Sequence, residues 1–177
     1  GLVSPDDLAA AIRADTVLVT IMLANNEIGT VQAIAELAAI ARERDVLFHT
    51  DAVQGVGQLD INVDTLGVDL LSLSAHKFYG PRGVGLLYAR RGVELAPIIY
   101  GGGQELDRRS GTENVAGIVG FGVAAQLAVE DLQRAPHLAA MRDRTERSLT
   151  EIDPNVKIFG AGAERLPNTS CLTMPGV

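Results

Sequence analysis

Three residue types that often mark a functional site are scarce in this sequence of 177 residues. It has one cysteine, Cys171, which excludes an internal disulfide and any Cys-x-x-Cys metal site. Its three histidines, His49, His76 and His137, do not have the spacing of a zinc motif, so we expect no structural metal. Lysine occurs only twice, once as Lys77, and arginine supplies the rest of the positive charge. Lysine is therefore not the ordinary surface cation of this chain.

Excess positive charge and long apolar runs are also lacking. The 15 basic and 22 acidic residues give a net charge of −7, which argues against a nucleic-acid surface built from clustered Lys and Arg. One of two arginine concentrations, Arg142, Arg144 and Arg147, alternates with Asp143 and Glu146, which is typical of a solvated helix face. No unbroken apolar run approaches the roughly 20 residues of a membrane helix, and no leader opens the sequence. We therefore expect no nucleic-acid partner, no membrane association and a cytoplasmic location.

The apolar residues that are present follow strand and helix periods in turn, which predicts an α/β fold. Predicted strands cover the apolar runs 16–24, 46–50, 68–74 and 84–89. Predicted helices cover 8–13 after an N-cap at Ser4, 34–45, a stretch capped by Asn114 and a second stretch after Pro136. Strand, helix and strand at short spacing indicate a parallel sheet, in which the first strand should be covered on both faces. The run 84–89 follows too closely for a crossover helix and should be antiparallel.

Two units are expected from the order of these elements. Residues 1–125 should form part of a large domain, with a mainly parallel sheet sandwiched by helices. The short apolar runs 156–159 and 169–174 predict strands of a second unit, so residues 126–177 should start a small α+β C-terminal domain. The sequence begins without methionine and stops just after an apolar run, and we expect it to be a fragment of a longer protein.

Polar residues follow three of the predicted strands, where α/β proteins keep their chemistry. They are Asn26, then Asp51 and Gln54, then Ser74, His76 and Lys77. A partly desolvated lysine can form a Schiff base with an aldehyde, and an ionised carboxylate can keep a pyridine nitrogen protonated. Hydroxyl and imidazole groups suit a phosphate, and amides suit a phenolic oxygen. The combination predicts a site for pyridoxal 5'-phosphate.

Taken singly, these residues have plainer interpretations. Lys77 alone would be a surface lysine, and Asp51 alone would cap a helix or turn. His49 is expected to be a hydrogen-bonded strand histidine and His137 a surface residue. The glycines of 80–85 do not make a nucleotide loop, because no Gly-Lys-Ser/Thr sequence follows them. Only the combination of amine and carboxylate favours a cofactor.

Four sequence blocks resemble the serial motifs of the NifS-type cysteine desulfurases, a group within the class V aminotransferase family of fold-type I pyridoxal-phosphate enzymes. The blocks are NNEIGTVQ at 25–32, HTDAVQ at 49–54, SAHK at 74–77 with GPRGVG at 80–85, and RSGTEN at 109–114. The resemblance runs from about residue 16 to 122, with the blocks in matching order and spacing.

The resemblance implies a role for each site residue. Lys77 would be the cofactor-binding and catalytic lysine, and Asp51 the partner of the pyridine nitrogen. The remaining cofactor contacts would be Gln54 and Asn26 at the phenolic oxygen, Ser74 and His76 at the phosphate, and Thr112 at the phosphate of a neighbouring subunit. A homodimer with shared sites is therefore expected.

The activity implied by the resemblance is conversion of L-cysteine to L-alanine. Lys77 would move the α-proton, and an enzyme cysteine would take the sulfur as a persulfide for a sulfur acceptor or iron-sulfur scaffold protein. That cysteine would lie beyond Val177, because Cys171 falls inside an apolar strand and is expected to be buried and inert.

Two alternatives remain open on the sequence. The chain could come from another class V enzyme, such as a selenocysteine lyase or an aminotransferase, which would keep Lys77 and Asp51. It could also be a non-catalytic scaffold that serves only for dimerisation or partner docking.

Overall fold

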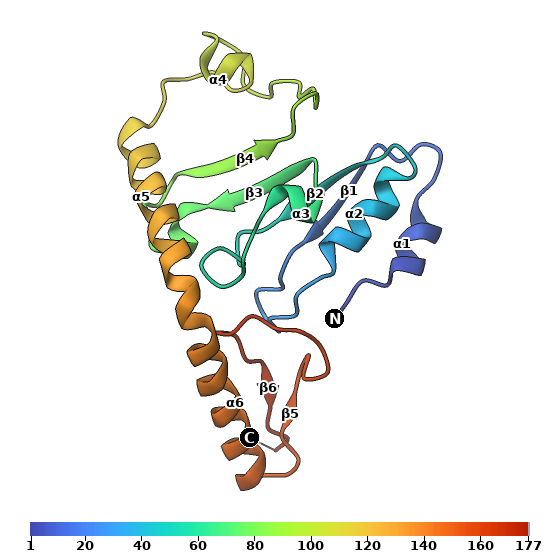
Figure 1. The fold of residues 1–177 in the computed structure, drawn as a ribbon, viewed down its shortest axis with the longest axis vertical. Helices are drawn as coiled ribbons and strands as arrows, with labels where there is room; N and C mark the ends of the chain where they lie inside the picture. The colour runs from blue at the N-terminus through green and yellow to red at the C-terminus, as the bar shows by residue number, and fades with distance from the viewer. Residues whose placement is uncertain (177) are drawn as a thin grey trace.

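Two separate sheets organise the computed structural model, which describes residues 1–176 (Figure 1). The larger sheet has four strands in the order β1-β2-β3-β4, and the smaller pairs β5 with β6. The strands are β1 Leu18–Met22, β2 Leu47–Asp51, β3 Leu70–Ser74, β4 Gly85–Ala89, β5 Lys157–Ile158 and β6 Leu172–Thr173. The first three run parallel, and β4 pairs antiparallel with β3. The predicted α/β architecture, with its reversed fourth strand, is confirmed.

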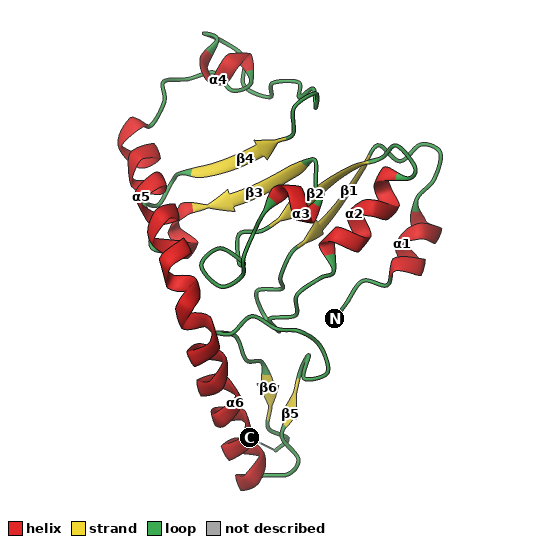
Figure 2. Cartoon of the chain, viewed as in Figure 1, coloured by secondary structure: helices red, strands yellow, loops and turns green. Residues whose placement is uncertain are grey.

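The helices flank the larger sheet or lead away from it (Figure 2). They are α1 Pro5–Ala11, α2 Ile34–Arg42, α3 Val63–Leu66, the 3-10 turn η1 Ala75–Phe78, α4 Gln104–Asp107, α5 Val115–Asp131, the 3-10 turn η2 Leu132–Arg134 and α6 Ala135–Ile152. Ser4 caps α1 by accepting a hydrogen bond from the backbone of Asp7, and Asn114 caps α5 through Gly117, as predicted. α2 connects the parallel strands β1 and β2, so it forms the expected crossover.

The main core lies between α2 and one face of the larger sheet. Leu37 and Ala41 on α2 pack with Phe48 of β2 and Leu71 of β3, and all four are almost fully buried. The opposite face is open in the described residues: Leu18, on that face of β1, is 42% exposed. The expectation that the first strand is covered on both faces is therefore wrong for residues 1–176. Successive side chains of a strand point to opposite faces, and the described helices cover only one of them.

α5, the 3-10 turn η2 and α6 follow one another without a loop and form a helical rod of 38 residues, Val115–Ile152, along one side of the molecule (Figure 1). The predicted second helical stretch near Pro136 corresponds to α6, which the 3-10 turn η2 separates from α5. Pro136 lies in the first turn of α6, where its missing backbone N–H costs little. By length and composition this helix could cross a membrane, a feature that unbroken apolar runs did not reveal. The core helix of a soluble protein passes the same test, so the feature is weak evidence for a membrane span.

A second apolar cluster fixes η1 against α5. The ring of Phe78 meets the ring of Phe121 edge to face, with centroids 5.3 Å apart. Gly80 follows in the turn, where an added Cβ would lie 2.9 Å from the carbonyl oxygen of Ala75 and 3.1 Å from Cβ of Ala124. Glycine is therefore the residue that permits this close approach. Because η1 contains His76 and Lys77, the cluster also fixes the backbone of the candidate site.

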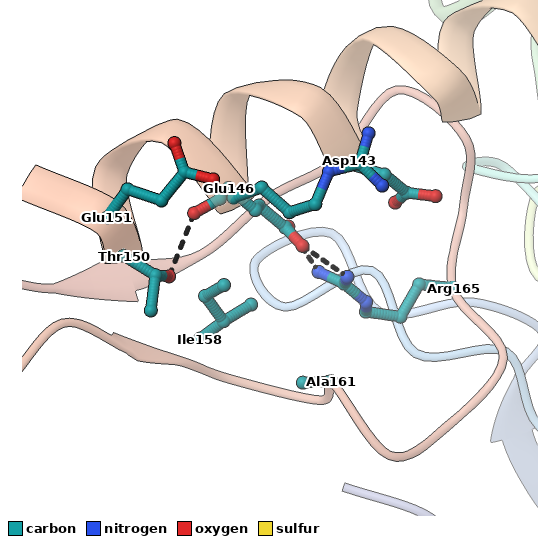
Figure 3. Close-up of a pocket in the computed structure, with 8 residues that line it drawn as sticks. Asp143, Glu146, Thr150, Glu151, Ile158, Ala161 and Arg165 are labelled. Atoms are coloured by element: carbon teal, nitrogen blue, oxygen red, sulfur yellow. Dashed lines mark hydrogen bonds and ion pairs between the residues drawn. The ribbon is translucent and has the colours of Figure 1, made fainter. Parts of the chain in front are cut away.

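The charged face of α6 differs from the prediction. Glu146 was expected on a solvated face, but its carboxylate is buried and binds Arg165 on the segment before β6 (Figure 3). The hydroxyl of Ser170, on the same segment, also donates to this carboxylate. Arg142, one turn earlier, is also largely buried and donates to the backbone oxygen of Leu166 at 2.6 Å. The prediction is wrong for these two residues, because the chain folds back from β5 and β6 onto α6.

Candidate active site

Asp51 is the last residue of β2 and lies on the open face of the larger sheet. Its Cα is in register with Met22 of β1 and Ser72 of β3. One carboxylate oxygen, Oδ1, accepts a hydrogen bond of 2.9 Å from the backbone N–H of Val53, where the chain turns away from the strand. The hydrogen bond holds the carboxylate at the end of β2, where the side chain is half-buried.

The end of β3 carries the second group of predicted site residues. Ser74 is the last residue of this strand, and its Oγ lies 2.9 Å from Nδ1 of His76 in η1. His76 and Lys77 are exposed, and Tyr79 ends η1 in a left-handed conformation at φ 66°. The sequence therefore leaves the strand in one tight turn, which places a hydroxyl, an imidazole and an amine close together along the chain.

Lys77 borders a cavity of about 120 Å³ between η1, α5 and the turn after β2. Gln58 lines the same cavity, and its Oε1 is buried without a hydrogen-bond partner anywhere in residues 1–176. Asp51 is not among the residues that line it. The amine and the carboxylate thus belong to neighbouring strand ends, but this cavity does not join them.

Asn26 and Gln54 lie in the turns that follow β1 and β2. Asn25 shapes the first turn by accepting hydrogen bonds of 2.9 Å from the backbones of Glu27 and Ile28. The exposed amide of Asn26 donates to Oε1 of Glu27 at 2.8 Å. Gln54 is half-buried. Both amides are therefore in loops at the ends of parallel strands.

The topology brings six of the seven predicted site residues to one edge of the sheet. β1, β2 and β3 are parallel neighbours, so the residues that end or follow them lie at the same edge. These residues are Asn26, Asp51, Gln54, Ser74, His76 and Lys77. Thr112 is not among them: it is exposed in the loop between α4 and α5, which follows the outermost strand β4 (Figure 1).

His49 forms the polar centre of the open face, and its two partners were not predicted. The structure confirms that it is a hydrogen-bonded strand histidine, with Nδ1 2.7 Å from Oγ1 of Thr20 and Nε2 2.6 Å from Oγ of Ser72. Burial lowers the pKa of His49, and the charge of Asp51 opposes this effect only in part. These partners, Thr20 and Ser72, could have been suspected from the sequence, because each is a hydroxyl residue inside an otherwise apolar strand next to β2.

The functional groups at this edge fit pyridoxal phosphate in chemical type. Asp51 offers a carboxylate whose Oδ2 has no hydrogen-bond partner within the described part of the chain, and such a group suits a pyridine nitrogen. Ser74 and His76 offer a hydroxyl and an imidazole side by side for a phosphate. Lys77 offers the amine that an aldehyde requires.

Comparison with known proteins gives a consistent picture. The family model for class V aminotransferases matches residues 1–177. The chain is 54% identical over 169 residues to the cysteine desulfurase IscS of Dictyoglomus turgidum, covering 95% of this chain and 43% of that protein. It is 50% identical to the cysteine desulfurase IscS of Methanosarcina thermophila, covering 98% of this chain and 43% of that protein. The chain thus spans less than half the length of these two relatives.

Solved structures agree with the sequence matches. A NifS-like protein superposes with a TM-score of 0.93 at 41% identity, covering 99% of this chain and 48% of that one. The NifS-like protein from Rickettsia africae superposes with a TM-score of 0.92 at 38% identity, covering 100% of this chain and 50% of that one. The family model, the relatives and the fold all lead to one conclusion, that this chain belongs to the class V aminotransferase family.

Proposed function

We propose that this chain is the major part of the cofactor-binding domain of a pyridoxal-phosphate-dependent cysteine desulfurase, which converts L-cysteine to L-alanine. The observation that carries the proposal is the meeting of a carboxylate, a hydroxyl–imidazole pair and a lysine at the ends of adjacent strands. Relatives that are 54% and 50% identical and bear the name cysteine desulfurase support the choice of reaction.

In this proposal the residues of the site contact different parts of the cofactor. Asp51 would hold the pyridine nitrogen, Asn26 and Gln54 the phenolic oxygen, and Ser74 with His76 the phosphate. When bound, the cofactor withdraws electrons from the α-carbon of the substrate. Lys77 has two tasks, to hold the aldehyde and then to move the α-proton, and its place on the exposed side of η1 leaves it accessible to a substrate.

A cysteine thiolate would attack the substrate sulfur, so that the S–S bond of a persulfide forms as the C–S bond breaks. The electron pair of that bond stays on the substrate carbon, which takes up a proton as alanine forms. We assign this nucleophile to a cysteine outside residues 1–177, because the backbone of Cys171 is fixed beside the small sheet. Cys171 lies directly before β6, not inside a strand as predicted, and its backbone oxygen accepts a hydrogen bond from the N–H of Phe159, directly after β5. The apolar context of Cys171 predicted a buried side chain, but the structure shows it half-buried. The persulfide would supply a sulfur acceptor or an iron-sulfur scaffold protein in the cytoplasm.

A homodimer with shared sites completes the proposal. Thr112 lies in the loop beyond β4, apart from the other six site residues, which fits a residue that reaches the phosphate in a neighbouring subunit. In this scheme residues 1–125 belong to the large domain and residues 126–177 start the small one.

The experiment uses the full-length protein and exchanges its lysines one at a time. Lys77→Ala should abolish both the visible absorbance of the bound cofactor and alanine formation from L-cysteine. Lys157→Ala is the matched control, since Lys157 is exposed on β5, and it should keep both. Retention of cofactor absorbance and turnover in Lys77→Ala would contradict the proposal. Turnover of L-selenocysteine without L-cysteine would favour the selenocysteine lyase alternative.

A further inference from the structure

His49 is held at both ring nitrogens by side chains of the two neighbouring strands. Nδ1 lies 2.7 Å from the hydroxyl of Thr20 on β1, and Nε2 lies 2.6 Å from the hydroxyl of Ser72 on β3. Thr20 is in register with His49 itself, whereas Ser72 is in register with Asp51. The imidazole therefore spans three strands on the open face, and its Ser72 contact lies beside Asp51.

Asp51 is the charged group that faces His49. The two residues are separated by one position on β2, so their side chains share a face of the sheet. The positions in register with them on the neighbouring strands carry no charge: they are Thr20 and Met22 on β1 and Leu70 and Ser72 on β3. Among His49, Asp51 and these four residues, Asp51 is therefore the one group with which a protonated His49 could form an ion pair.

Such an ion pair would compete with the cofactor. A carboxylate that is paired with an imidazolium binds a protonated pyridine nitrogen more weakly, because the imidazolium already neutralises its negative charge. In the structure Asp51 accepts its hydrogen bond from the backbone of Val53, and both nitrogens of His49 are engaged elsewhere.

We propose that His49 is a positioning residue: the hydroxyls of Thr20 and Ser72 hold its ring so that it cannot turn toward Asp51, and the Asp51 carboxylate stays available to the pyridine nitrogen. The inference rests on the proposed function, because it needs that nitrogen. Burial lowers the pKa of His49, which keeps the ring neutral at neutral pH. A neutral ring donates to one hydroxyl and accepts from the other, so two hydroxyls are matched partners for it.

The test removes both hydroxyls from the full-length protein, as Thr20→Val together with Ser72→Ala. Freed from them, His49 should turn toward Asp51, and its pKa, measured by NMR in the cofactor-free protein, should rise by about one unit. Pyridoxal phosphate should then bind about tenfold more weakly at a pH below the measured, raised pKa of His49. Near pH 8 the ring is neutral in both proteins, so affinity should change much less.

Two controls separate this effect from a loss of packing. Thr20→Ser with Ser72→Thr keeps both hydroxyls and should restore the wild-type pKa of His49. Thr50→Val removes a hydroxyl from the residue between His49 and Asp51, on the other face, and should leave the pKa of His49 unchanged.

The possible results point in different directions. An unchanged pKa of His49 in the double variant would overturn the proposal, and so would a loss of affinity that is equal at both pH values. Failure of the wild-type protein to bind pyridoxal phosphate would instead contradict the proposed function. The titration of His49 in the cofactor-free protein would then still decide whether the two hydroxyls hold the ring.

Discussion

Arg165 and Glu146 form a two-point ion pair in the interior of the molecule (Figure 3). Nη1 lies 2.7 Å from Oε1 and Nη2 lies 2.8 Å from Oε2, and the two side chains are only 6% and 8% exposed. The residues on either side of Arg165 bond through their backbones to the segment 29–31, which follows β1. The pair therefore ties α6 to the turn that carries Asn26.

Loss of this ion pair should destabilise the protein strongly. Glu146→Gln removes the charge but keeps the size, and it leaves the Arg165 guanidinium buried without a counter-charge. Breaking a buried pair in this way costs about 3–5 kcal/mol. We expect a fall of that order in the free energy of unfolding, measured by urea denaturation of the full-length protein.

Glu151→Gln is the matched control for this substitution. Glu151 lies on the same helix and lines, with Glu146 and Arg165, an open groove beside the ion pair, but its side chain is exposed (Figure 3). Its substitution should change the free energy of unfolding by less than about 0.5 kcal/mol. Equal effects of the two substitutions would mean that the ion pair adds nothing.

The same pair predicts a pH dependence of stability. The hydrogen bonds from Arg165 hold the pKa of Glu146 below its ordinary value. The ionised Glu146 therefore contributes its full share to the free energy of unfolding above a pH of about 4.3, the pKa of glutamate in an unfolded chain. This share is lost as the pH falls through the lower pKa of Glu146 in the folded protein. The stability gap between wild type and Glu146→Gln should be constant from about pH 8 to 6 and shrink below about pH 4. A gap that persists undiminished near pH 3 would disprove this link.

Gly80→Ala should disturb the turn that carries Lys77. The new methyl group would lie 2.9 Å from the backbone oxygen of Ala75 in η1 and 3.1 Å from Cβ of Ala124 in α5. η1 and α5 would therefore have to move apart to make room for it. Overpacking of this kind costs about 1–3 kcal/mol, and we expect weaker cofactor binding as well. Gly122→Ala on the open side of α5 meets no atom within 4 Å and should be neutral or stabilising. Calorimetry and cofactor titration of both variants measure the difference.

Thr50→Val should stabilise the protein. The hydroxyl of Thr50 is fully buried on the core face of β2 and has no hydrogen-bond partner in residues 1–176. Replacing it by a methyl group removes an uncompensated polar atom, which is worth about 1 kcal/mol. Thermal unfolding would detect the gain, and a lower melting temperature would show that the hydroxyl has a partner in the whole protein.

The sequence allowed the sheet, and the edge at which the candidate site residues lie, to be predicted, because the relevant signals are local. Apolar runs end abruptly at Asp51 and Ser74, so the edge where these residues meet follows from the run lengths and the crossover rule. The edge-to-face contact of Phe78 and Phe121 was not predicted. The place of Lys77 did not depend on it, because the end of the apolar run already put Lys77 in the turn after β3.

The remaining features depend on contacts between distant parts of the chain. Glu146 looks like an ordinary surface charge of α6, and nothing within one helical turn reveals that Arg165 will bury it. The two hydroxyls that hold His49 belong to Thr20 and Ser72, which are 29 and 23 positions away in the sequence. Only the strand register brings them next to the ring.

The most direct measurement of the central claim is chemical trapping of the cofactor on its lysine. The full-length protein, loaded with pyridoxal phosphate, is reduced with borohydride, digested and analysed by peptide mass spectrometry. The account predicts that the added pyridoxyl mass is found on the peptide containing Lys77 and is absent from it in Lys77→Ala. Its recovery on Lys157 alone, or on no lysine of this chain while the protein still turns over L-cysteine, would contradict the account.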